Sequence, residues 1–124
     1  MTSKNKKILL VEDEESNRLC LRDFLVYHGY VCQEAENGAE GLSKLHSEHF
    51  DLVIMDLNMP EMNGFQLLEA LASSPLVKQI PILIVTGQSL HEVKQKATHP
   101  WVKDVLAKPY DFPKILQTLT TLFS

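Results

Sequence analysis

The 124-residue sequence has little cysteine and lacks any long apolar run. Cys20 and Cys32 form neither a C-x-x-C pair nor a disulfide framework, which indicates two small hydrophobic residues in a reducing cytoplasm. No apolar stretch approaches the roughly 20 residues that a membrane-spanning helix needs, and no segment resembles a signal peptide. We therefore expect a cytoplasmic protein that does not contact the membrane.

An excess of basic residues is also absent. The chain has 12 Lys and Arg residues against 16 Asp and Glu residues, and its formal charge is −4. Sequence-independent binding of nucleic acid needs a basic face, so this balance argues against it. The glycine-rich loops G-x-x-x-x-G-K-[ST] and G-x-G-x-x-G are missing as well, which argues against the common nucleotide-binding enzymes.

What the chain does contain is a regular alternation of strand-like and helix-like segments. With 44% hydrophobic residues it can form one globular domain over residues 1–124, with a sizeable core. Five apolar runs predict strands: Ile8–Val11, Val31–Ala35, Leu52–Met55, Ile80–Val85 and Val105–Ala107. A helical pattern follows each strand, so we predict an α/β fold with a doubly wound parallel sheet, (βα)5 and flavodoxin-like, in the strand order 2-1-3-4-5.

Polar residues inside or beside these segments refine the prediction. Gln33 and Glu34 interrupt the second run, which places that strand at an edge of the sheet. Ser16 or Asn17 is expected to cap the first helix, and Asp111 the last one.

Several strands end in residues suited to phosphoryl or metal chemistry. Glu12 and Asp13 follow the first strand and Asp56 follows the third, and these strands flank the switch point where such folds bind ligands. Carboxylates about 4 Å apart repel by about 4 kcal/mol per pair, and a divalent cation relieves this repulsion. An all-oxygen ligand set favours Mg²⁺. With Thr86 and Lys108 at the same rim, the sequence predicts a phosphoryl-transfer site around Asp56.

Four stretches carry a resemblance to a known family: ILLVEDEESN, DLVIMDLNMPEMNGFQLL, PILIVTG and VLAKP. Together they resemble the receiver domain of two-component response regulators, of the single-domain type. The resemblance implies that Asp56 accepts a phosphoryl group from a sensor histidine kinase or a histidine phosphotransfer protein. It further implies that Glu12, Asp13 and Asp56 hold Mg²⁺, together with the backbone carbonyl of Asn58.

The resemblance also assigns roles on the last two strands. Thr86 matches the family's switch hydroxyl, and Lys108 matches the lysine that pairs with the phosphoryl group and precedes a cis peptide bond to Pro109. Asn58 and Gln88 occupy the positions that tune hydrolysis of the acyl phosphate in the family. Such a domain is not a classical enzyme, because it catalyses at most its own phosphorylation and dephosphorylation.

The chain departs from the family pattern near the fifth strand. Val105 stands where the family has its switch aromatic, and Gly87 stands where a residue such as Ala commonly follows the switch hydroxyl. We expect the signal to reach an unknown downstream protein through the face of the fourth helix, fifth strand and fifth helix. We also expect that face to be altered, with Trp101 as a candidate contact.

Two other functions remain open at this point. A degenerate receiver would act as an interaction module without phosphorylation, and Val105 is the feature that favours it. A Mg²⁺-dependent phosphohydrolase would also use an aspartyl phosphate. It would need a general acid two residues after Asp56, where Asn58 cannot transfer a proton.

Overall fold

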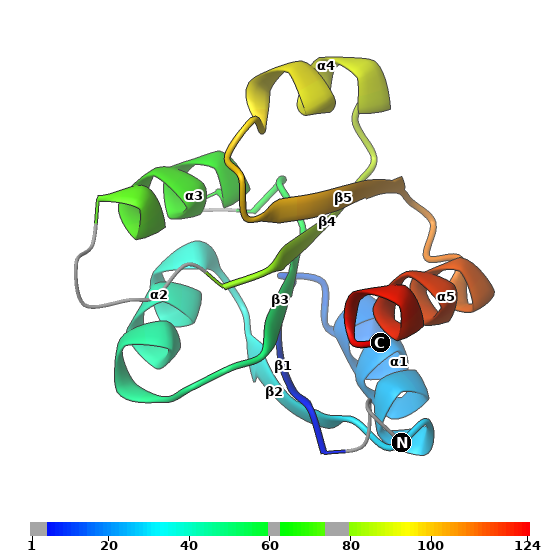
Figure 1. Cartoon of the computed structure of the whole chain (residues 1–124). Coiled ribbons are helices and arrows are strands. Elements are labelled where there is room, and N and C mark those ends of the chain that lie inside the picture. Colours follow the sequence, from blue (N-terminus) through cyan, green and yellow to red (C-terminus); the bar gives the residue numbers. More distant parts are fainter. Residues whose placement is uncertain (1–4, 60–62, 74–79) are drawn as a thin grey trace.

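The computed structural model describes residues 5–59, 63–73 and 80–124, and in this part of the chain five parallel strands form one sheet with five helices around it (Figure 1). The strands are β1 (Lys7–Val11), β2 (Val31–Ala35), β3 (Leu52–Met55), β4 (Ile82–Thr86) and β5 (Val102–Ala107). The helices are α1 (Glu15–Tyr27), α2 (Gly38–Ser47), α3 (Gly64–Ala72), α4 (Leu90–Lys96) and α5 (Phe112–Leu122). The predicted α/β fold class is confirmed.

The strand order is β2-β1-β3-β4-β5, as the alternation of strands and helices predicts. β2 lies at one edge of the sheet, where its polar residues predict it, and β5 lies at the other edge. Val11 is paired with Met55 in the register of β1 and β3. The residues that follow this pair, Glu12 and Asp56, therefore leave the sheet at the same level.

The sheet separates two hydrophobic clusters, because the central strands are apolar on both faces. Side chains such as Ile8, Leu10 and Ile54 pack on one face against α1 and α5. Alternate side chains such as Leu9 and Val53 pack on the other face against α2, α3 and α4. Figure 1 shows this division, with α1 and α5 on one side of the sheet and α2 and α3 on the other. All five residues of β4 and all four of β3 are buried, as expected for central parallel strands.

Several predicted boundaries need correction. β1 begins at Lys7 rather than Ile8. Glu14, not Ser16 or Asn17, caps α1, because its carboxylate accepts a 2.7 Å hydrogen bond from the Asn17 backbone N–H. β4 begins at Ile82 rather than Ile80 and includes Thr86. β5 begins at Val102 rather than Val105, because its first half lies at the sheet edge, where Lys103 is exposed and Val102 and Asp104 are half-buried, so that it carries no apolar run.

Other terminal features agree with the sequence. The Asp111 carboxylate accepts a 3.1 Å hydrogen bond from the Lys114 backbone N–H and caps α5 as predicted. None of the helices in the described residues is both long and apolar enough to cross a membrane.

Candidate functional site

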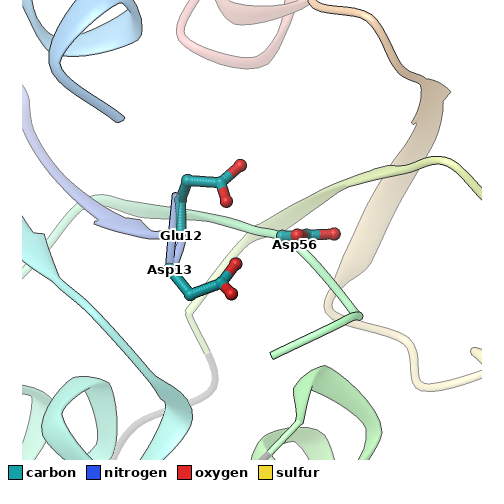
Figure 2. A group of neighbouring side chains, drawn as sticks. All are labelled: Glu12, Asp13 and Asp56. Carbon is teal, nitrogen blue, oxygen red and sulfur yellow. The ribbon is translucent and has the colours of Figure 1, made fainter. Parts of the chain in front are cut away.

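Three carboxylates converge at the ends of β1 and β3. One oxygen each from Glu12, Asp13 and Asp56 lies within 4.8 Å of the other two, and Figure 2 shows the three side chains extending into one region. Glu12 and Asp56 are buried, whereas Asp13 is exposed. Within the described ranges this is the one group of at least three His, Cys, Asp or Glu side chains with this spacing. The structure therefore brings together the residues that the strand ends predict.

Lys108 joins two of these carboxylates. Its Nζ lies 2.8 Å from Glu12 Oε1 and 3.0 Å from Asp56 Oδ2. Burial alone lowers the pKa of Lys108, but the hydrogen bonds and charges of Glu12 and Asp56 outweigh it, so the pKa is raised above its usual value. The lysine is therefore a fixed positive charge beside Asp56.

Glu12 is held at both of its carboxylate oxygens. The Tyr110 hydroxyl donates a 2.7 Å hydrogen bond to Oε1, and the Glu14 backbone N–H donates a 3.0 Å bond to Oε2. Burial raises the pKa of Glu12, but the bonds from Lys108, Glu14 and Tyr110 together hold the pKa below its usual value. Glu12 is therefore ionised at neutral pH although its side chain is buried.

Sequence reasoning missed Tyr110. Burial and the neighbouring Glu12 carboxylate raise the pKa of Tyr110, so its hydroxyl stays protonated and remains a donor. The available signal is the position of an aromatic residue directly after Lys108-Pro109, at the same end of the sheet.

The expected repulsion acts on Asp13. Although Asp13 is exposed, partial desolvation of its carboxylate, a hydrogen bond shared with Glu12 and the charges of Glu12 and Asp56 all raise the pKa of Asp13 above its usual value. Three carboxylates against the one Lys108 ammonium leave two negative charges uncompensated. Hard oxygen donors with excess negative charge suit a small divalent cation, so the residues present fit Mg²⁺.

β4 and the loops after β3 and β4 contribute the remaining residues at the rim of the site. Thr86 is fully buried, and its Oγ1 accepts a 3.0 Å hydrogen bond from the Gln88 backbone N–H. Gln88 Nε2 donates a 2.7 Å bond to Asn58 Oδ1, which joins the loops after β4 and β3. The Asn58 backbone N–H lies 3.3 Å from Asp56 Oδ1.

The connection from β5 continues this rim. The Lys108 backbone N–H donates a 2.8 Å hydrogen bond to the Thr86 carbonyl, which ties the end of β5 to the end of β4. The Lys108-Pro109 peptide bond is cis, as the family resemblance implies.

Val105 and Trp101 both belong to the core on the α4 side of the sheet. Val105 is 5% exposed and Trp101 9% exposed, and both lie in the cluster that contains Val93. The Trp101 ring packs against His99 with ring centroids 4.9 Å apart. Trp101 therefore exposes little surface to which a partner could bind. At the position of the family's switch aromatic this chain has Val105, which has no ring.

The family is shown by comparison with known proteins. Residues 8–120 match the family model described as the response regulator receiver domain. This chain belongs to the receiver-domain family of two-component signalling. The resemblance carried by the four sequence motifs is thereby confirmed, and the family consists of signalling domains rather than classical enzymes.

Curated relatives include both short proteins and parts of long ones. The chain is 37% identical over 113 residues to the sensor histidine kinase RcsC of Escherichia coli K12, and the match spans 91% of the chain but only 12% of RcsC. It is 32% identical to protein PilH of Pseudomonas aeruginosa, over 95% of the chain and 98% of PilH. Receiver domains of this kind thus occur both as most of a short protein and within a longer kinase.

Solved structures agree with the fold. Chemotaxis protein CheY4 of Vibrio cholerae is 33% identical, with a TM-score of 0.86, over 94% of this chain and 98% of that protein. Response regulator TrrA of Thermotoga maritima, solved in complex with Mg²⁺-BeF, is 29% identical, with a TM-score of 0.82, over 94% of this chain and 98% of that protein.

Proposed function

We propose that Asp56 accepts a phosphoryl group from the phosphohistidine of a sensor histidine kinase or a histidine phosphotransfer protein, in a reaction that requires Mg²⁺. Residues 1–124 would act as a single receiver domain in the cytoplasm, without contact to nucleic acid or membrane. The observation that carries the proposal is the convergence of Glu12, Asp13 and Asp56, with Lys108 Nζ 3.0 Å from the Asp56 carboxylate.

In this proposal the metal ligands are Glu12, Asp13, Asp56 and the backbone carbonyl of Asn58. Support comes from the oxygen donors and the uncompensated negative charge of the cluster, and from the Mg²⁺-BeF complex of TrrA. When bound, Mg²⁺ supplies electrostatic stabilisation of the charge on the transferred group.

The transfer itself is an in-line displacement at phosphorus. An Asp56 carboxylate oxygen attacks, the new O–P bond forms, and the P–N bond to the donor imidazole breaks, with the electron pair leaving on the imidazole nitrogen. Lys108 is held beside Asp56 before reaction, so its ammonium can pair with a phosphoryl oxygen without a large rearrangement. The Thr86 hydroxyl would donate a hydrogen bond to a second phosphoryl oxygen.

Water resets the domain. Hydrolysis of the acyl phosphate breaks the bond to the phosphoryl group, restores the Asp56 carboxylate and releases inorganic phosphate. Asn58 and Gln88 would set the rate of this hydrolysis, and their side chains are hydrogen-bonded to each other at the rim of the site. Output would then pass by protein contact through the face of α4, β5 and α5 to a downstream protein.

A phosphorylation-independent interaction module is the second candidate, and Val105 is the observation that favours it. Because Val105 is a buried valine, it cannot move a ring between buried and exposed positions in response to Thr86. The intact cluster of Glu12, Asp13, Asp56 and Lys108 favours the phosphoacceptor function over this candidate.

Incubation with Mg²⁺ and acetyl phosphate, followed by intact-mass measurement, separates these functions. We expect the wild-type protein to gain the mass of one phosphoryl group, and expect the gain to be absent with EDTA or in Asp56→Asn. No gain in the wild-type protein would instead support the interaction module. Multiple turnover of added phosphate esters would support a phosphohydrolase.

A further inference from the structure

Arg18 is a buried charged residue on α1 that the proposed chemistry does not use. Only 7% of it is exposed, and a buried arginine needs partners for its charge and its hydrogen-bond donors. We propose that Arg18 is a positioning residue for the acidic site, because it fixes the main chain of Glu12 and thereby aims Glu12 and Asp13 at Asp56. This inference rests on the proposed function of the site as a Mg²⁺-dependent phosphoacceptor.

The guanidinium of Arg18 joins three elements. Its Nη1 donates a buried 2.9 Å hydrogen bond to the Glu12 backbone carbonyl, and its Nε donates a 2.8 Å bond to Glu34 Oε1. Arg18 thus connects α1 to β2 and to the connection after β1. A guanidinium presents its donors in a rigid planar fork, so fixing Nε on one partner also fixes the direction of Nη1.

Glu34 provides a firm anchor for this fork. Its second carboxylate oxygen lies 3.0 Å from Arg22 Nη1. Burial raises the pKa of Glu34, but the hydrogen bonds and charges of Arg18 and Arg22 lower the pKa below its usual value, so Glu34 stays ionised. The backbone carbonyl of Glu34 also accepts a hydrogen bond from Lys44 Nζ. Arg18 therefore binds a residue of β2, Glu34, that is also held by Arg22 from α1 and by Lys44 from α2.

The held residue, Glu12, begins the short connection between β1 and α1. Its backbone N–H donates a 3.1 Å hydrogen bond to the Ala35 carbonyl, and its own carbonyl accepts from Arg18. Both peptide groups that flank Glu12 are thus fixed, one by β2 and one by the guanidinium. The second of these peptide groups leads directly into Asp13, so a rotation of it would redirect the Asp13 carboxylate. Without Arg18, the buried carbonyl of Glu12 would lose its partner, and such a rotation is the expected response.

The chain offers a matched control. Arg22 lies one helical turn after Arg18 and binds the same Glu34 carboxylate, but its side chain hydrogen-bonds to Glu34 and Asp23 rather than to Glu12. If Arg18 only strengthens the contact between α1 and β2, then Arg18→Met and Arg22→Met should both change stability and leave metal affinity alone. If Arg18 positions the site, only its replacement should weaken metal binding.

The experiment is a titration of the full chain with MgCl₂ alone. Binding is measured from the NMR chemical shifts of the Asp13 and Asn58 amides. Urea unfolding of each variant checks that it is folded at the start of the titration. Groups that orient metal ligands typically change metal affinity by about 10- to 100-fold when removed. We expect the Mg²⁺ dissociation constant to rise at least about tenfold in Arg18→Met and to change less than about twofold in Arg22→Met.

If Arg18→Met does not fold, a more conservative variant still tests the inference. Arg18→Lys keeps the positive charge but lacks the planar fork, so it should remain folded and still bind Mg²⁺ more weakly than the wild-type protein. Equal dissociation constants for wild-type protein and Arg18→Lys, or for Arg18→Met and Arg22→Met, would overturn this inference alone. If the wild-type protein shows no Mg²⁺-dependent shifts, the proposed function is overturned and the inference with it.

Discussion

Lys108 Nζ lies 3.0 Å from Asp56 Oδ2, although 52 residues separate the two in the sequence. The same ammonium lies 2.8 Å from Glu12 Oε1, so one cation pairs with two buried carboxylates that follow different strands. The contact therefore has two consequences. It stabilises the fold before any metal is bound, and it places a positive charge where a phosphoryl group on Asp56 would carry negative charge.

Replacing Lys108 by Met should destabilise the protein. Removing one partner of a buried ion pair leaves an uncompensated charge, so we expect the free energy of unfolding to fall by about 3 kcal/mol in metal-free buffer at pH 7. Mg²⁺ should recover part of this loss, because it supplies positive charge to the same carboxylates. Urea unfolding with and without MgCl₂ measures both effects.

Lys94→Met is the control for this change, because Lys94 is exposed on α4. It should alter the free energy of unfolding by less than about 0.5 kcal/mol. If the Lys108 variant is as stable as the Lys94 variant without Mg²⁺, the ion pairs of Lys108 do not stabilise the fold.

Gly64→Ala should disturb the backbone at Asp56. A Cβ at Gly64 would lie 2.5 Å from Leu57 Cδ2 and 2.9 Å from the Asp56 carbonyl oxygen, so the β3–α3 connection would have to move. Overpacking of this kind costs about 2 kcal/mol, and we expect slower phosphorylation by acetyl phosphate as well. Gly87→Ala is the matched control, because a Cβ there meets no heavy atom within 4 Å. Equal phosphorylation rates for the two variants would show that the β3–α3 connection tolerates the added methyl group.

Asp51→Asn should destabilise the protein in a pH-dependent way. Burial raises the pKa of Asp51, but the 2.8 Å hydrogen bond from the Lys7 backbone N–H and the contact with His49 hold the pKa below its usual value. A lowered folded pKa means that this stabilisation is present above the unfolded pKa of about 3.9 and is lost as pH falls through the folded pKa. We expect a loss of about 1 kcal/mol at pH 7 that becomes smaller as the pH falls below about 3.9.

Urea unfolding at a series of pH values measures this difference, and His49→Gln serves as the control because it leaves the Lys7 bond intact. A destabilisation of Asp51→Asn that stays constant from pH 7 to pH 3 would argue against the charge of Asp51 as its cause.

Much of the fold follows from local sequence patterns. Apolar runs of strand length, each followed by a helical pattern, predict the parallel sheet, and the rules of crossover handedness leave few orders. The convergence of Glu12, Asp13 and Asp56 follows in turn, because the ends of neighbouring parallel strands meet at one edge. The early start of β5 escapes this reasoning, since half-exposed polar residues at a sheet edge carry no apolar pattern.

The residues that hold the site in place could not be predicted in the same way. The burial of Arg18 depends on two partners, the Glu12 carbonyl and the Glu34 carboxylate, that only the folded chain brings to it. The bond from Tyr110 to Glu12 spans 98 residues and leaves no periodic signal. Glu14 caps α1 although two better capping residues, Ser16 and Asn17, follow it, because the end of β1 fixes where the helix can begin.

The central claim is that Asp56 itself carries the phosphoryl group. Borohydride reduces an aspartyl phosphate to homoserine, so treatment of the protein after incubation with Mg²⁺ and acetyl phosphate marks the acceptor covalently. Peptide mass spectrometry should then find homoserine at position 56 in the wild-type protein, at no other aspartate, and in no sample prepared with EDTA. Homoserine at Asp13 or at another aspartate, or its absence from a sample whose intact mass shows phosphorylation, would contradict the assignment of Asp56.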